Sequence, residues 1–116
     1  AYFADRSGRQ VELPARTTRA LPERFALWQN APNPFNPSTQ IPFDLSEEGV
    51  RVELTIFNVM GQPVRHLLRA GGMRAGRYRL TWDGRDNLGR LVGSGVYLYA
   101  LRAGDFVQSR KLLLMK

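Results

Sequence analysis

Few side chains in this sequence could do acid, base or metal chemistry. The chain has one histidine, His66, and no cysteine. A lone histidine has no partner for a zinc site or for a Cys–His nucleophile pair. The neighbouring residues Leu67 and Leu68 are apolar, as in a strand. The sequence therefore predicts His66 as a partly buried or edge residue, and it predicts no bound metal.

The carboxylates are equally scattered. Glu47 and Glu48 are adjacent in a predicted turn, and Asp83 and Asp86 share one short loop with Asn87. The sequence places no pair of them across a cleft, as glycoside hydrolysis requires. The loop oxygens could bind calcium, although their spacing lacks the alternating order of an EF-hand, and tight turns favour the same residue types. We expect a turn there, with calcium as the alternative, and we expect neither enzyme activity nor a cofactor.

The aromatic residues offer a third kind of chemistry, because a row of exposed rings can stack on sugars. Trp28, Tyr97 and Tyr99 are the candidates for such a row. Tyr78 and Trp82 alternate with charged residues along one predicted strand, a pattern typical of a buried face. We therefore expect Trp82 in the core and Trp28 as an exposed ring.

Length and charge restrict the class of protein. The 116 residues, 43% hydrophobic and 23% charged, fit one globular domain with little room for a deep enzyme cleft. The formal net charge is +7, but the arginines are scattered singly and alternate with apolar residues, as on the solvent side of strands. We interpret the charge as a solvated face and expect no nucleic-acid partner. An anionic glycan is the alternative target.

Residues 1–24 lack the regular apolar alternation of the rest of the chain. Residues 1–24 carry Pro14 and Pro22, and their only hint of a strand is Val11 with Leu13. We interpret them as a linker or the end of a preceding domain. The chain begins without an initiator methionine or a signal peptide, so we expect a module of a longer protein. The core domain is expected to cover residues 25–116.

Apolar alternation predicts an all-β fold, an immunoglobulin-like antiparallel β-sandwich of about seven strands. Pro42 marks its strand as an edge strand. The glycines after Ala70 are expected to break the fourth strand, and residues 83–90 are expected to form a polar loop. Residues 96–103 are apolar on both faces, which predicts a central strand. The expected strands are residues 25–27, 40–45, 50–56, 64–68, 78–82, 96–103 and 106–116.

A proline-rich segment precedes the second predicted strand. Pro32, Pro34 and Pro37 remove three backbone donors within a few residues and fix φ at each position. Asn33 and Asn36 each precede a proline and are expected to close local side-chain turns. The result is a stiff crossing segment with few conformations to lose on folding.

The last predicted strand has two apolar faces, although a simple edge strand needs only one. It ends in a run of three leucines and a methionine. This strand is therefore either central in its sheet or in contact with a partner. An exposed strand edge can be recognised by strand addition, in which the backbone supplies affinity and side-chain pockets supply specificity. The apolar run comprises Leu112, Leu113, Leu114 and Met115.

Six segments follow one another in the order found in a known family. They are residues 27–41 (LWQNAPNPFNPSTQI), 57–64 (FNVMGQPV), 75–78 (AGRY), 82–90 (WDGRDNLGR), 94–97 (SGVY) and 109–112 (SRKL). Together they resemble the C-terminal sorting domain of the type IX secretion system, type A, which is described as similar to the Ig-like domain of the flagellar hook capping protein. The resemblance covers residues 25–116.

The resemblance implies a non-catalytic secretion signal and surface-attachment domain. Such a domain directs a larger cargo protein through the periplasm and across the outer membrane of a Gram-negative bacterium, and a sortase-like peptidase removes it. The implied location is secreted or on the outer-membrane surface. The implied partners are the outer-membrane secretion machinery and that peptidase, with anionic lipopolysaccharide as a further partner. The cleavage region would correspond to the linker before Phe25.

The resemblance also assigns residues, position by position. Its Gly-x-Tyr element and its C-terminal lysine-plus-apolar strand are the implied recognition elements. The proline-rich segment and the Trp-Asp-Gly turn are structural motifs. The recognition residues are Gly95, Val96, Tyr97, Lys111, Leu112, Leu113, Leu114, Met115 and Lys116. The structural residues are Asn30, Pro32, Asn33, Pro34, Phe35, Asn36, Pro37, Trp82, Asp83 and Gly84.

Two other classes of function stay open. One is a carbohydrate-binding module, which would need an exposed row formed by Trp28, Tyr97 and Tyr99. The other is a passive Ig-like spacer or hook-assembly part, for which the position within the parent protein is decisive. A homodimer through an exposed strand edge is also open, because the fold alone does not determine function.

Overall fold

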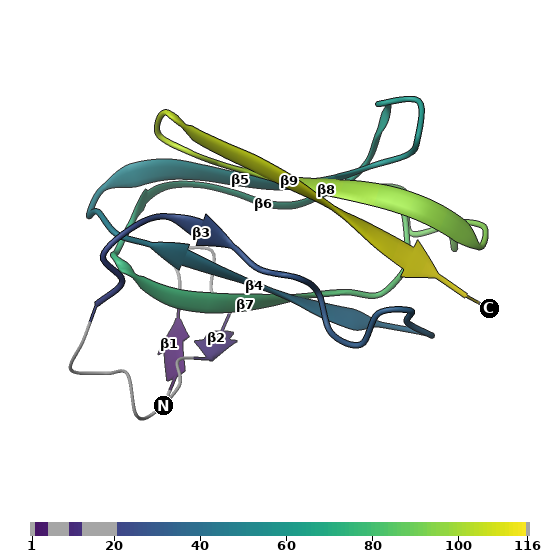
Figure 1. The fold of residues 1–116 in the computed structure, drawn as a ribbon, viewed down its shortest axis with the longest axis horizontal. Coiled ribbons are helices and arrows are strands. Elements are labelled where there is room, and N and C mark those ends of the chain that lie inside the picture. Colours follow the sequence, from purple (N-terminus) through teal and green to yellow (C-terminus); the bar gives the residue numbers. More distant parts are fainter. Residues whose placement is uncertain (1, 5–9, 13–20, 116) are drawn as a thin grey trace.

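The structure is a computed structural model that describes residues 2–4, 10–12 and 21–115. Two antiparallel sheets pack face to face, as Figure 1 shows. One sheet has the order β3-β4-β7 and the other has the order β6-β5-β8-β9. The expected seven-stranded all-β sandwich is confirmed. Its strands are β3 (Ala26–Leu27), β4 (Thr39–Leu45), β5 (Val50–Phe57), β6 (Pro63–Met73), β7 (Gly76–Trp82), β8 (Gly95–Ala103) and β9 (Phe106–Leu114).

A short hairpin stands in the N-terminal segment. Strand β1 (Tyr2–Ala4) pairs antiparallel with β2 (Gln10–Glu12), and Phe3 lies opposite Val11. Strand β2 lies close to β7. The strand hint at Val11 is therefore confirmed, whereas Leu13 lies outside the described residues.

Period-two alternation places the core between the sheets. In β5, Val52, Leu54 and Ile56 are fully buried, while Arg51 on the opposite face is exposed. Trp82 is fully buried as predicted, and Trp28 is 49% exposed, also as predicted. Strand β8 is central, because it lies between β5 and β9. Within the described residues no helix could span a membrane.

Strand β6 is longer than predicted. The glycines after Ala70 were expected to end it, but it continues to Met73. Val50 pairs with Met73 and Val52 pairs with Ala70, so β6 has one more residue than β5 between these two pairs. Gly72 takes a φ of 69° within that bulge. The glycine pair therefore bends the strand through a bulge instead of breaking it.

Strand β4 is central in its sheet, so the prediction of an edge strand from Pro42 was wrong. In a strand the N and C=O of one residue point to the same side, and those of Pro42 point toward the end of β3. The Trp28 amide donates to the Pro42 carbonyl at 3.0 Å. Proline cannot return that bond, and the Trp28 carbonyl instead accepts the Tyr99 hydroxyl at 2.7 Å. The missing donor is compensated by a side chain from the other sheet.

Candidate functional site at the C-terminal strand

The two predicted recognition segments lie side by side. Gly95 pairs with Leu114, Val96 pairs with Leu113, and Tyr97 pairs with Leu112. The start of β8 and the end of β9 thus form one antiparallel ladder. Lys116 lies outside the described residues. The remaining members of the recognition set occupy one continuous piece of the four-stranded sheet.

The apolar run at the end of β9 divides between two faces. Leu112 and Leu114 are 1% and 3% exposed and belong to the core. Lys111 and Leu113 point to the outer face, where Lys111 is opposite Leu98. Met115 is 52% exposed beyond the end of the strand. Half of the run therefore completes the core, and the other half is available at the surface.

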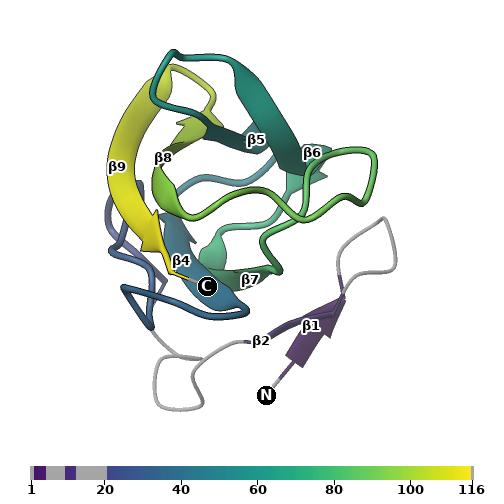
Figure 2. The same ribbon diagram turned by 90° about the vertical axis from the view of Figure 1, so that its right-hand side faces the viewer.

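Strand β9 is the edge of its sheet, so it is not central. A segment of the same chain covers its C-terminal half, which is a third arrangement beside the two that were expected. The Leu113 amide donates to Asn33 Oδ1 at 2.9 Å, and the Leu113 carbonyl accepts the Phe35 amide at 3.0 Å. The Met115 amide donates to the Phe35 carbonyl at 3.1 Å. Figure 2 shows this end of β9 beside the loop that leads into β4.

Residues 29–37, which we call the proline-rich cover, thus replace a neighbouring strand. Gln29 adds a bond from Nε2 to the Lys111 carbonyl at 2.9 Å. Asn33 was expected to close a local turn, but its carboxamide oxygen reaches across the sandwich. Among residues 21–115, no hydrogen-bonding partner covers the outward backbone of Val107 or Ser109. The edge is therefore closed at the C-terminal end of β9 and open near its start.

Side chains of β9 in turn cover the edge of the opposite sheet. Arg110 Nε donates to the Leu27 carbonyl at 2.6 Å, and the Leu27 amide donates to Gln108 Oε1 at 3.3 Å. These bonds satisfy the outward backbone groups of β3, as a neighbouring strand would do. On this side of the sandwich, β9 side chains cover the edge of β3, and the proline-rich cover that follows β3 covers the end of β9.

Asn30 fixes the proline-rich cover from inside. It is 3% exposed, and its Nδ2 donates to Thr39 Oγ1 at 3.0 Å and to the Pro32 carbonyl at 3.2 Å. The Thr39 hydroxyl donates to the same carbonyl at 2.8 Å. The Asn30 amide donates to the Tyr99 hydroxyl at 2.9 Å. All three X-Pro peptide bonds of the cover are cis.

An aromatic chain joins the cover to the recognition ladder. The rings of Phe35 and Trp82 are 5.5 Å apart, and those of Trp82 and Tyr97 are also 5.5 Å apart, edge to face. A Cβ built on Gly84 would be in ordinary contact with the Pro37 carbonyl oxygen at 3.6 Å and with Leu114 at 3.8 Å, and the φ of 75° is what favours glycine in this turn. The predicted structural motifs therefore meet the predicted recognition elements at one end of the sandwich.

The tyrosines do not form a sugar-binding row. Tyr99 is fully buried, and its hydroxyl bonds to the cover. Tyr97 packs against Trp82 and donates to the Gly93 carbonyl at 2.7 Å. Burial raises the pKa of both phenols. Trp28 is the one exposed member of the expected row.

The polar loop uses its oxygens within the fold. Asp83 Oδ1 accepts the Arg85 amide at 3.1 Å, and Asn87 Oδ1 accepts the His66 amide at 2.9 Å. His66 lies on the edge strand β6, half-buried, with Nδ1 3.2 Å from Thr55 Oγ1. The bond to Arg85 is that of a turn, and the bond to His66 joins the loop to β6. In the described part of the chain, no three acidic, histidine or cysteine side chains gather as metal ligands.

The sequence reasoning missed the polar residues that close the edges. Asn33 and Leu113 are 80 residues apart in sequence, and Arg110 and Leu27 are 83 apart. No local pattern connects such pairs. A partial signal existed in Gln108 and Arg110, which are polar residues at positions of β9 that face the core side.

The sandwich and its closed edge place the chain in the immunoglobulin-like class of all-β domains. The FlgD Ig-like domain family matches residues 31–105, and the chain belongs to that family. None of the curated protein sequences compared with it is similar enough to count as a match.

Solved structures that share the fold include three bacterial proteins. Dimeric latent PorU from Porphyromonas gingivalis aligns with a TM-score of 0.61 and 18% identity, over 77% of this chain and 9% of PorU. PorZ, described as an essential surface component of the type IX secretion system of the same bacterium, aligns with 0.52 and 18%, over 78% of this chain and 12% of PorZ. FlgD from P. aeruginosa aligns with 0.51 and 20%, over 66% and 58%. The chain therefore corresponds to a small part of the two Porphyromonas proteins.

Proposed function

We propose that this chain is a non-catalytic secretion signal and surface-attachment domain of the type IX system. It directs a larger cargo protein across the outer membrane, and a sortase-like peptidase separates it from the cargo in the segment before Phe25. The outer face of the ladder formed by Gly95–Tyr97 and Lys111–Met115 carries the signal. One observation supports this most: the two motifs, which lie on the consecutive strands β8 and β9, form that single ladder. The shared fold of PorU and PorZ is consistent with it.

The covered edge determines how the signal could be recognised. Because the proline-rich cover occupies the outward backbone of Leu113 and Met115, strand addition there requires the cover to leave first. Recognition of the side chains on the outer face does not require the cover to leave. Lys111 and Leu113 stand on that face with Val96, which is 44% exposed. We therefore assign the first recognition contact to these side chains.

The experiment uses a reporter fused in front of the chain in a host that has this secretion system. Deleting residues 111–116 should leave the reporter in the periplasm, but it also removes Leu112 and Leu114 from the core. The sharper variant is Leu113→Ser with Lys111→Glu, which changes the outer face alone. The matched control is Val107→Ser on the same face of β9.

We expect the fusion with the double variant to accumulate in the periplasm, while the Val107→Ser control reaches the surface. The melting temperature of the double variant should equal that of the wild type. Surface display of a folded double variant would refute the assigned face. Surface display of the deletion variant would refute the secretion function itself. A passive spacer is distinguished in the same assay, because without a signal the unmodified fusion stays in the periplasm.

A further inference from the structure

Two turns at one end of the sandwich are built on the same plan. Residues 58–62 connect β5 and β6, and residues 86–90 lie in the loop after β7. In the first turn, Asn58 Oδ1 accepts the amides of Met60 and Gln62, each at 3.0 Å. The Asn58 amide donates to the Gln62 carbonyl, and the Gly61 amide donates to the Asn58 carbonyl, again at 3.0 Å. We call residues 58–62 and 86–90 the twin turns.

The second turn repeats each of these bonds. Asp86 Oδ1 accepts the amides of Leu88 and Arg90 at 2.9 and 3.0 Å. The Asp86 amide donates to the Arg90 carbonyl, and the Gly89 amide donates to the Asp86 carbonyl. The fourth residue is glycine in both turns, with φ of 80° at Gly61 and 82° at Gly89. The first and last side chains also bond in each turn.

This plan explains the Asn or Asp and the glycine, but it does not explain the third residue. Met60 is 80% exposed and Leu88 is 76% exposed. The turn bonds use only the backbone of these two residues, so any side chain would serve. Val59, the second residue of the first turn, and Leu91, directly after the second turn, are 69% and 56% exposed. Each turn region thus exposes a pair of apolar side chains that are close in sequence, and exposed apolar surface of this kind marks interaction sites.

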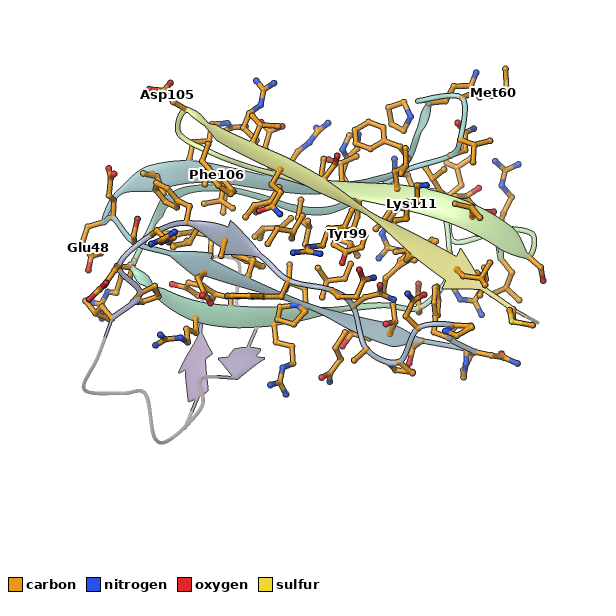
Figure 3. The ribbon with its side chains drawn as sticks, in the orientation of Figure 1. Glu48, Met60, Tyr99, Asp105, Phe106 and Lys111 are labelled. Carbon is orange, nitrogen blue, oxygen red and sulfur yellow. The ribbon has the colours of Figure 1, made fainter. Side chains whose placement is uncertain are left out.

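The second turn is tied to the strand that follows the first. The Asn87 amide donates to the Val64 carbonyl at 3.0 Å, and Asn87 Oδ1 accepts the His66 amide at 2.9 Å. These bonds hold the twin turns at the same end of the molecule, and Figure 3 shows Met60 projecting from it. The apolar tips are therefore presented by fixed supports.

A pocket of about 280 Å³ opens beside the second turn. Its apolar lining comes from Pro63, Val64, Leu88 and Val92, and its polar lining includes Asp86 and Arg90. Small-molecule sites usually measure roughly 300–1,000 Å³. This pocket is at or below that range and is open, so it suits one large side chain of a partner better than a whole small ligand.

The charges around the pocket favour an acidic partner. Both carboxylate oxygens of Asp86 are occupied, Oδ1 by two amides and Oδ2 by Arg90 Nε at 3.0 Å. Asp83 lies within 4 Å of both Arg65 and Arg85. Three guanidinium groups and two carboxylates thus leave one positive charge in excess beside the pocket, of which Arg90 lines the pocket itself, in a chain with net charge +7.

We infer that the twin turns form a docking surface for an acidic segment of a partner protein, which places one large apolar side chain in the pocket beside Leu88. A lipid surface suits this end less well, because insertion would bring the carboxylates of Asp83 and Asp86 into contact with acyl chains. A peptide can supply both the apolar anchor and the matching acidic groups. This surface is separate from the β8–β9 ladder, so the inference does not depend on the proposed function.

The test is panning of a random phage-displayed peptide library against the immobilised full chain. We expect the enriched peptides to share a large apolar residue flanked by Asp or Glu. The Met60→Ser, Leu88→Ser double variant should retain at most about one tenth as many of these phage as the wild type. The reason is that it loses the apolar surface that the anchor buries. The matched control is Val107→Ser, an exposed apolar residue of β9 near the opposite end, where Figure 3 labels Phe106.

A second variant tests the charge. Arg90→Gln should weaken the preference for acidic flanks, whereas Arg90→Lys should retain it. Failure to enrich any peptide, or peptides that bind wild type and double variant equally, would overturn the inference. So would cosedimentation of wild type, but not of the double variant, with phosphatidylglycerol vesicles, because a lipid surface would then be the occupant. Melting curves of all variants separate loss of binding from loss of fold.

Discussion

The two edges of the four-stranded sheet are closed by the same device but with different support. At β9, the Leu113 amide donates to Asn33 Oδ1, and at β6, the His66 amide donates to Asn87 Oδ1. In both places an asparagine side chain replaces the carbonyl of a missing neighbouring strand. Unpaired edges invite association with other chains, so both devices protect the fold.

The two edges differ in how the segment that carries each asparagine is anchored. The proline-rich cover is anchored in the core by Phe35, which is 2% exposed, and by Asn30, which is 3% exposed. Residues 83–92, which we call the loop cover, are held by their own turn bonds, by Trp82 Nε1 donating to the Arg85 carbonyl at 2.9 Å and by the half-buried Val92, and Leu88 and Leu91 remain exposed. The edge next to the proposed signal is therefore closed as part of the core, whereas the edge at β6 is closed by an addition to the surface.

The largest expected effect comes from removing the anchor of the proline-rich cover. Phe35→Ala deletes a buried ring that contacts Trp82, and such changes cost about 3–5 kcal/mol of unfolding free energy. Urea unfolding followed by fluorescence measures this. The matched control is Phe106→Ala, a half-buried ring 5.6 Å from Phe25, which should cost clearly less. Equal costs would mean that the cover is not part of the core.

The contrast also explains what the sequence could reveal. Strands β5 and β7 follow from strict alternation of apolar and polar residues, and these two strands indicated the sandwich. The burial of Trp82 follows from the same local pattern. Local periodicity is sufficient where one face of a strand contacts the core and the other contacts water.

The missed features depend on partners distant in sequence. Pro42 was interpreted as a sign of an edge strand because no local sequence pattern indicates that Tyr99 supplies the replacement donor. The glycines near Met73 looked like a break because a bulge is defined by its pairing with β5. The proline-rich segment was recognised as stiff, but its role as a cover depends on Leu113, 80 residues from Asn33.

The second prediction compares the two asparagines directly. Asn33→Ala and Asn87→Ala each leave one edge amide without its acceptor, and each should cost about 1 kcal/mol. Hydrogen exchange measured by NMR should show the Leu113 amide about fivefold faster in the first variant. In the second variant, the His66 amide and several neighbouring amides should accelerate, since the loop cover places no fully buried side chain in the core.

The number of amides whose hydrogen exchange accelerates in each variant decides between the two kinds of support. If Asn33→Ala accelerates amides all along the end of β9, the Phe35 anchor does not hold the cover in place. If Asn87→Ala affects His66 alone, the loop cover is as firmly supported as the proline-rich cover. Either result would remove the distinction between the two edges.

The smallest expected effects concern two carboxylates, Asp44 of β4 and Asp86 of the loop cover, and they have opposite signs. Burial raises the pKa of Asp44, against the opposing influence of the Trp28 hydrogen bond and of Arg77. The folded state therefore binds this proton more tightly than the unfolded state, and stability falls as pH rises through the window above 3.8. The Arg90 amide, together with the Leu88 amide and the Arg90 side chain, lowers the pKa of Asp86. That stabilisation is complete above 3.8 and is lost as pH falls through the lower folded value.

Asp44→Asn and Asp86→Asn should therefore separate in urea unfolding at pH 7. Asp44→Asn is expected to be more stable than wild type, because it removes a charge that burial disfavours, and the gain should shrink toward pH 3. Asp86→Asn is expected to be less stable, and its loss should also shrink at low pH. The geometry should survive this second change, because Asn58 occupies the equivalent position in the other twin turn with the same bonds. A loss at Asp86→Asn that persists at low pH would show that the turn needs the carboxylate for shape, and the equivalence of the two turns would then be wrong.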